Sequence, residues 1–205
     1  MDILLLGTLI AIGIFMLNAK QQRRRIALLA SHLGHYQIEK LMENLTEGYL
    51  RALGESDPER REHIWNLLRT TERQLSEQFT QFAADFARVQ PAQARVSTLP
   101  LALPLADQWL PQATFDMRQA LQLHAQGIAR AVRNEAGRST RDQAYTLSAE
   151  LFLMQHTCHW FCKSLPVASA RLLARHQTSH AQVLAAVDPA TRSAYQALLR
   201  GRKNS

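Results

Sequence analysis

Seventeen uncharged residues in a row near the amino terminus constrain this chain more than any other feature. Residues 3–19, ILLLGTLIAIGIFMLNA, are mostly Leu and Ile and reach the lower end of the length that crosses a bilayer as a helix. A signal peptide carries positive charge before its apolar run, whereas here Lys20 and the arginines at 23–25 follow it. Because basic residues stay on the cytoplasmic side, the sequence predicts an uncleaved anchor (1–25) with its amino terminus outside the cytoplasm.

The remainder of the chain has the composition of a helical globular protein. The whole chain of 205 residues is 46% hydrophobic and includes only eight Gly and seven Pro, and the prolines fall between apolar patterns of period 3.6. No stretch alternates with period two for long enough to predict a strand. We therefore predict an all-α fold: a single N-terminal transmembrane helix continuing into a long antiparallel helical hairpin, followed by a cytoplasmic helical bundle.

The hairpin is predicted over residues 26–89. The apolar pattern that starts at Ile26 persists to Gly54, so we expect the anchor helix to continue unbroken to that point. Asp57 and Pro58 form a helix start signal for the second arm. Its apolar residues are spaced like a coiled-coil seam, which pairs either within the chain or with a second copy in a homodimer. The seam consists of Leu68, Leu75, Phe79, Phe82 and Phe86.

A proline- and leucine-rich connector follows at residues 90–111. Two helices of about thirty residues extend ~45 Å outward and return by the same distance, so the chain is expected back at the bilayer near Val89. The segment 96–111 holds a single charge and one tryptophan, Trp109. It therefore fits either the membrane interface, where tryptophan is favoured, or a buried strap across the bundle.

Residues 112–200 are expected to form the bundle, with a basic tail at 201–205. The pattern predicts helices at about 113–134, 140–163 and 166–187, and a short one from Pro189 to Leu199. Thr140 with Gln143 reads as a capping box at the start of the second of these helices.

Four side chains of the bundle could form a metal site. Counting back from the expected turns places His124, Glu150 and His180 at one level, with His176 one turn away. Such a set is suited to zinc or iron held between facing helices. The alternative is that these are boundary histidines that hydrogen-bond to Glu150 or to water.

The order of four residues, His124, Cys158, His176 and His180, resembles the ligand order of the bacterial chemoreceptor zinc-binding domain. That family is a helical bundle, and the resemblance implies a zinc site. The glycine-containing motif around the cysteine of that family is missing here, and the level count separates Cys158 from the other three residues.

The two cysteines, Cys158 and Cys162, lie in the segment HTCHWFC (156–162). Their spacing of four places them on one helical face, where they are expected to be free thiols in the cytoplasm. They could offer two ligands to a soft metal or act in redox chemistry, but structural zinc needs four ligands, so core packing is favoured.

The net charge of +7 lies entirely in residues 112–205, which hold twelve basic and five acidic side chains. Nucleic-acid binding is disfavoured, because no helix-turn-helix signature is present and the aromatic residues lie in apolar stripes. Contact with anionic lipid or with an acidic partner is the alternative. The candidates for that contact are Arg23, Arg24, Arg25, Arg171 and Arg175.

The sequence lacks a phosphate-binding glycine loop, a GxSxG elbow and an HExxH motif. We therefore expect no catalysis and no resident cofactor. The expected function is that of an adaptor, scaffold or regulatory subunit that holds an unidentified protein partner at the cytoplasmic face of the inner membrane. The alternatives are a metal- or redox-sensing bundle and a protein that binds anionic lipid at the membrane surface.

Overall fold

The computed structural model describes residues 2–99 and 109–200 and is predominantly helical. The longer helices are α1 (Asp2–Leu33), α2 (Ile38–Gly54), α3 (Pro58–Phe86), α6 (Met117–Arg133), α7 (Thr140–Cys162), α8 (Leu165–His176), α9 (His180–Ala186) and α10 (Pro189–Arg200). The short elements are α4 (Pro91–Ala94), β1 (Arg95–Ser97), the 3-10 turn η1 (Pro111–Ala113) and β2 (Thr114–Asp116).

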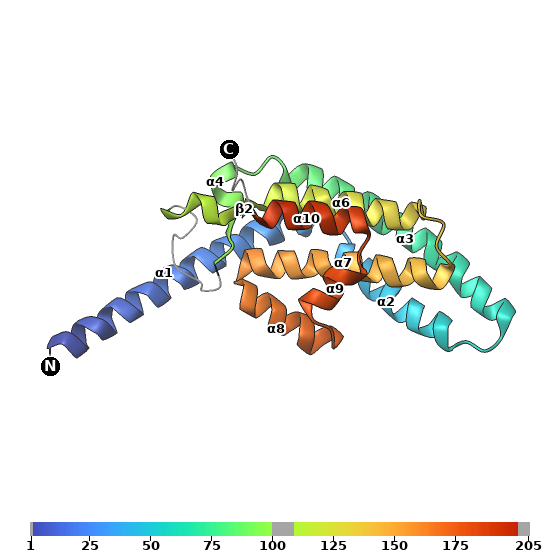
Figure 1. The fold of residues 1–205 in the computed structure, drawn as a ribbon, viewed down its shortest axis with the longest axis horizontal. Helices are drawn as coiled ribbons and strands as arrows, with labels where there is room; N and C mark the ends of the chain where they lie inside the picture. Colours follow the sequence, from blue (N-terminus) through green and yellow to red (C-terminus); the bar gives the residue numbers. More distant parts are fainter. Residues whose placement is uncertain (1, 100–108, 201–205) are drawn as a thin grey trace.

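The amino-terminal half of α1 extends away from the other helices (Figure 1). Its apolar side chains are open, with Leu4 80% and Phe15 73% exposed. The helix is long and apolar enough to cross a membrane, and no part of its most apolar window is covered by the rest of the chain. The predicted membrane-spanning helix is therefore present as a candidate span.

The expected continuous helix from the anchor to Gly54 is wrong, because the chain breaks at residues 34–37. Gly34 is a poor helix former, and the following residues are held by α3 instead of by a further helical turn. The Tyr36 hydroxyl donates to Asp85 and its ring packs edge-on against Phe82, while the Gln37 N–H donates to Gln78 Oε1 (2.7 Å). These contacts with α3 hold the break between α1 and α2.

The predicted seam of α3 is buried against other helices of the same chain. α2 and α3 pack side by side, with the buried Tyr49 hydroxyl donating to Glu72 Oε1 (2.6 Å) between them. All five seam residues are buried in the main hydrophobic core: Leu68, Leu75, Phe79, Phe82 and Phe86. A second copy therefore cannot pair through these side chains while this core is intact.

Two short strands depart from the expectation that the chain contains none. β1 and β2 pair antiparallel, with Val96 opposite Phe115. Trp160 of α7 fixes them, because its indole N–H donates to the Ser97 carbonyl (3.1 Å) and its ring packs edge-on against Phe115. Three residues per strand are too few to produce a readable alternation.

The predicted connector, 90–111, contains α4 and β1. Residues 100–108, which carry most of its leucines and half of its prolines, lie outside the described residues. Trp109 and Leu110, next to that gap, are exposed. Arg95 lies beside α1, because its carbonyl accepts from Arg25 Nη2 (2.7 Å). The chain therefore lies beside the basic flank of α1 again at Arg95.

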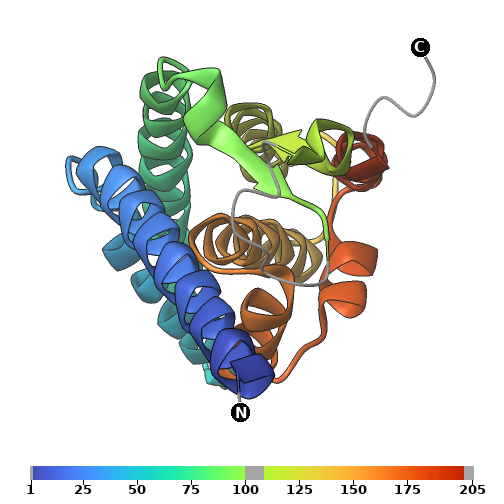
Figure 2. The same cartoon turned by 90° about the vertical axis from the view of Figure 1, so that its left-hand side faces the viewer.

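The second half is arranged around α7. Figure 2 shows α7 end-on, with α1 and α3 on one side and α6, α9 and α10 around the other. α7 begins as predicted at Thr140, but its cap is Ser139, whose hydroxyl accepts from the Asp142 N–H (3.2 Å). The Gln143 side chain instead donates to the last carbonyls of α6.

The expected single helix over 166–187 is wrong, because the structure divides it into α8 and α9. Gln177 ends α8 in the left-handed region (φ 54°). Ser179 then starts α9 in a capping box, in which its hydroxyl accepts from the Gln182 N–H and the Gln182 side chain accepts from the Ser179 N–H. This S-x-x-Q signal was readable in the sequence, but the apolar pattern that runs across it obscured it.

Candidate functional site

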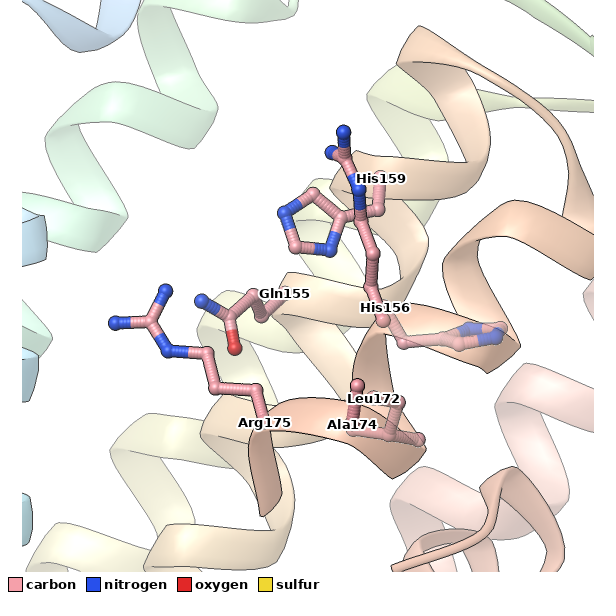
Figure 3. A pocket seen from close by; sticks show the side chains of 7 residues that line it. Gln155, His156, His159, Leu172, Ala174 and Arg175 are labelled. Carbon is pink, nitrogen blue, oxygen red and sulfur yellow. The ribbon is translucent and has the colours of Figure 1, made fainter. Parts of the chain in front are cut away.

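The strongest candidate site is a cavity of about 430 Å³ between α7 and α8. Figure 3 shows the side chains of Gln155, His159 and Arg175 directed to the same side of the two helices, while the ring of His156 points away from them. The full lining is Gln155, His156, His159, Arg171, Leu172, Ala174 and Arg175.

The local sequence explains why the two arginines face this cavity. α8 starts with Pro166 in its first turn and packs on α7 through the buried Ala168 and Leu172. Arg171 and Arg175 are one helical turn apart, so they lie on one face of α8. His176 is turned toward α7, where its Nε2 hydrogen-bonds to Gln155 Oε1 (2.9 Å) and its ring stacks on Phe152.

The electrostatic potential at this cavity is positive. Burial, and then the nearby charges of Arg171 and Arg175, lower the pKa of His159 below its ordinary value. Burial and Arg175 likewise lower the pKa of His176. The histidines are therefore neutral at pH 7, and no carboxylate is among the described residues that line the cavity. Such a pocket is suited to an anion.

A second, largely apolar cavity of about 300 Å³ lies between α7 and the first three helices. It shares Gln155, His159 and Arg171 with the first cavity. Its apolar lining comprises Ile26, Leu29, Ala30, Leu33, Ile38, Met42, Phe79, Phe82, Met154 and Cys158, and its remaining lining residues are Glu39, Cys162 and Lys163.

Both predicted thiols lie at this apolar cavity. Cys158 and Cys162 are free and half-buried, and the Cys158 Sγ lies 3.9 Å from the Met154 sulfur. Burial raises the pKa of Cys158, and it raises the pKa of Cys162 to about 11 despite the nearby cations Arg25, Arg171 and Lys163. Thiolate is the reactive form, so this environment suits packing better than redox chemistry.

We expect native Cys162 to react with iodoacetamide at pH 7.5 on the order of 100-fold more slowly than an unfolded thiol, because so little thiolate is present. Alkylation followed by mass spectrometry over time measures the rate. Cys162→Ser isolates Cys158, and urea gives the unfolded reference. Rapid labelling of the folded chain at either cysteine would support the redox alternative instead.

The structure does not bring the predicted metal ligands together. His124 hydrogen-bonds through Nε2 to the Thr157 hydroxyl (2.9 Å), and His176 lies against Phe152 and Gln155. Over residues 2–99 and 109–200, no group of three or more His, Cys, Asp or Glu side chains is placed to hold a metal ion. The zinc or iron alternative therefore gains no support from the arrangement of these residues.

The level count was wrong by one to two helical turns. It paired His124 with Glu150, but His124 bonds to Thr157, seven residues further along α7. Glu150 instead lies against Gly127, where a Cβ would be 2.6 Å from Thr191 Oγ1 and closer still to Glu150 Oε2. The turn between α6 and α7 contains Asn134 and Gly137 in the left-handed region, and the simple count from a single pivot does not describe such a turn.

A buried polar cluster, which sequence reasoning missed, joins α6, α7, α9 and α10. The Thr157 hydroxyl links His124 to the Tyr195 hydroxyl (3.0 Å), and the rings of His156 and His180 stack 4.2 Å apart. His124 Nδ1, His156 Nδ1 and His180 Nε2 have no hydrogen-bond partner in the described structure. Thr157 and Tyr195 lie within apolar patterns, so no sequence signal distinguished them.

A second buried network closes the bundle around Glu150. The Asp188 N–H donates to Glu150 Oε1 (3.0 Å), and Arg130 Nη2 donates to Thr191 Oγ1 (2.9 Å). The Asp188 carboxylate also pairs with Arg138 (2.9 Å). Burial raises the pKa of Glu150 to about 7. These arginines of the basic second half therefore hold the bundle together.

The arginines of the basic flank that follows the apolar run have two different environments. Arg23 and Arg24 are exposed and remain candidates for lipid contact. Arg25 instead lies over the Phe161 ring, 5.5 Å from its centroid, and bonds to the Arg95 carbonyl. Lys163 Nζ donates to Gln22 Oε1 (3.0 Å) nearby. These contacts fix the part of α1 that follows the apolar run to the body.

No protein-family model, curated protein or solved structure matches this chain.

Proposed function

We propose that this is a single-pass protein of a bacterial inner membrane, with its amino terminus outside and the chain from residue 26 onward in the cytoplasm. There it acts as a non-catalytic adaptor that holds a protein partner at the membrane. In this proposal α2 and α3 form the predicted hairpin stalk, and α6–α10 form the bundle that supports it.

The exposure of α1 supports the membrane location. A helix in the core of a soluble protein is mostly buried, whereas the apolar window of α1 is uncovered. Lipid is the natural cover for such a surface. The basic side chains that follow the apolar run favour a cytoplasmic location for the body.

We expect Ile10→Arg to release much of the protein from the membrane fraction, because an arginine at the centre of a span costs about 3 kcal/mol and this apolar run is short. Alkaline carbonate extraction of full-length protein measures the released fraction, with Ile10→Ala as the matched control. A fluorescent protein fused after Ser205 should fluoresce in the cytoplasm. A reporter active only outside the cytoplasm would overturn the orientation.

The observation that carries the adaptor proposal is a set of exposed leucines far from the anchor. We call them the tip leucines: Leu50 (69% exposed), Leu53 (53%) and Leu67 (60%). The Leu68 side chain packs over Gly48, so Leu50 and Leu67 lie at about the same level of the helix pair. The loop that joins α2 to α3 lies at the end of the molecule opposite the amino terminus (Figure 1). An apolar surface held away from the bilayer fits a protein partner.

The test is a pull-down from membranes after mild crosslinking, with full-length wild type compared with Leu50→Gln/Leu67→Gln. We expect the variant to lose the partner captured by wild type while keeping its thermal stability, because exposed substitutions change stability by about 0.5 kcal/mol or less. Leu173→Gln, at another exposed leucine on α8, is the matched control.

A partner that is retained by the tip variant but lost by the Leu173 control would place the interface elsewhere and overturn the assignment to the tip. Turnover of a substrate by the purified protein would overturn the non-catalytic role. If the captured partner is a second copy of the chain, the tip leucines form a homodimer interface, and the adaptor proposal fails in that form.

A further inference from the structure

The cavity of about 430 Å³, which we call the polar cavity, adjoins the apolar cavity of about 300 Å³. Together they provide the two halves of one ligand site. We propose that they bind an anionic amphiphile with an alkyl chain, its acidic head at Arg171 and Arg175 and its chain in the apolar cavity. This site is separate from the tip leucines, so its failure and the failure of the proposed adaptor function are distinguishable.

Arg171 and Arg175 supply the charge for the head. Both are exposed at the polar cavity, and neither has an ion-pair partner in the part of the chain that the structure describes. Arginine forms charge-assisted, often bidentate hydrogen bonds with carboxylate and phosphate. The neutral His159 and the amide of Gln155 lie beside them and can add weaker polar contacts (Figure 3).

The apolar cavity fits the chain. Its volume of about 300 Å³ accommodates on the order of ten methylene groups, if each is about the size of a water molecule at roughly 30 Å³. Its walls are aliphatic, aromatic and sulfur-containing side chains of α1, α2, α3 and α7. A mainly apolar cavity with a few convergent polar groups is typical of small-molecule sites.

The charges at the two cavities also set the direction of the ligand. Glu39 is the one carboxylate among the described residues that line either cavity, and it belongs to the apolar cavity. The apolar cavity also has two cations, Lys163 and Arg171, whereas the polar cavity has Arg171 and Arg175 and no carboxylate among its described lining residues. An anionic head is therefore attracted to the two arginines of the polar cavity. Arg171 lines both cavities, so it lies where head and chain would join.

The position of the apolar cavity suggests two sources of ligand. Ile26 follows directly after the basic flank, and the α1 residues that line the cavity extend from it to Leu33. At 1.5 Å per residue this wall begins beside the expected headgroup layer and reaches about 12 Å below it. A fatty acid from the cytoplasm and an anionic phospholipid from the inner leaflet share the required chemistry.

The test uses full-length protein in nanodiscs of phosphatidylcholine and photoreactive probes with a diazirine in the alkyl chain. One arm uses a photoreactive palmitic acid, a second uses photoreactive phosphatidylglycerol, and a third uses the neutral palmityl alcohol. After irradiation, mass spectrometry maps the labelled peptides. We expect an anionic probe to label segments 26–42 and 154–163, and the neutral alcohol to label them at least tenfold less.

Two variants test the two halves of the site. Arg171→Gln/Arg175→Gln should reduce labelling roughly tenfold, whereas Arg69→Gln/Arg73→Gln, an exposed pair with the same spacing on α3, should not. Ala30→Trp should fill the apolar cavity and block labelling, whereas Ala27→Trp, an exposed alanine outside the cavity lining, should leave it unchanged.

Labelling by palmitic acid alone would identify a free fatty acid as the ligand, and labelling by phosphatidylglycerol would identify a membrane lipid. Labelling confined to residues 4–17, equal labelling by the neutral alcohol, or labelling insensitive to the cavity variants would overturn the proposal.

Discussion

Gly127→Val should lower the free energy of unfolding by about 3–5 kcal/mol, because a side chain at this position meets a buried polar network. A Cβ on residue 127 would overlap Glu150 Oε2 and would lie 2.6 Å from Thr191 Oγ1. Glu150 and Thr191 are both fully buried, and Glu150 is held by the Asp188 N–H. Because the carboxylate is buried and hydrogen-bonded, we expect the valine to push α6 away from α7 and α10.

Thermal or urea unfolding of the full-length protein in mild detergent, followed by far-UV circular dichroism, measures this loss. The matched control is Gly54→Val at the end of α2, where a Cβ would meet nothing within 4 Å. We expect the control to change stability by about 0.5 kcal/mol or less. If both variants lose the same amount, the cost comes from β-branching in a helix, and the close approach of α6 to Glu150 is not what fixes the bundle.

The sequence predicted those parts of the fold that depend on local chemistry. The apolar run gave α1, the Asp57 cap with Pro58 gave the start of α3, and Asp188 with Pro189 gave the start of α10. It failed where contacts between distant segments decide the conformation. The break at 34–37 is held by Asp85 and Gln78 of α3, and no pattern within the first helix reveals them.

The candidate site was predicted in part. Arg171 and Arg175 were identified by their spacing and charge, and both line the polar cavity. The apolar cavity was not predicted, because it depends on how α1, α2 and α7 meet. The four predicted metal ligands do not lie at one level, because an error of one to two turns in helix register moves every side chain of one helix past those of its neighbour. Register errors of this size cannot be detected from helix boundaries alone.

Buried histidines should make the protein sensitive to acid. Burial lowers the pKa of His124 to about 3 and that of His156 to about 3. At His156 the charges of neighbouring histidines add to the effect of burial. An imidazole in the unfolded chain has a pKa of about 6.5. Stability is therefore present above pH 6.5 and is lost as the pH falls toward 3, because only the unfolded chain takes up these protons. At pH 5 each of these two histidines lowers the free energy of unfolding by about 2 kcal/mol.

Glu150 opposes this trend. Burial raises the pKa of Glu150 to about 7. The positive charge of Arg130 partly opposes this shift, and the negative charge of Asp188 adds to it. A raised pKa means that the folded chain takes up a proton before the unfolded chain does. The stabilisation from Glu150 is therefore complete below its ordinary pKa of about 4.5 and is lost as the pH rises through 7. Between pH 7 and pH 5 it offsets about 2 kcal/mol of the loss from the histidines.

We therefore expect Glu150→Gln to be more sensitive to acid than wild type. Glutamine keeps a carbonyl oxygen for the Asp188 N–H but does not titrate, so the histidine effect is no longer offset. From pH 7 to pH 5 the variant should lose about 2 kcal/mol more unfolding free energy than the wild type. Urea unfolding at several pH values measures both. If the unfolding free energy of the two proteins changes with pH in parallel, Glu150 ionises with its ordinary pKa. If the unfolding free energy of the variant does not change with pH, the histidines ionise with their ordinary pKa values.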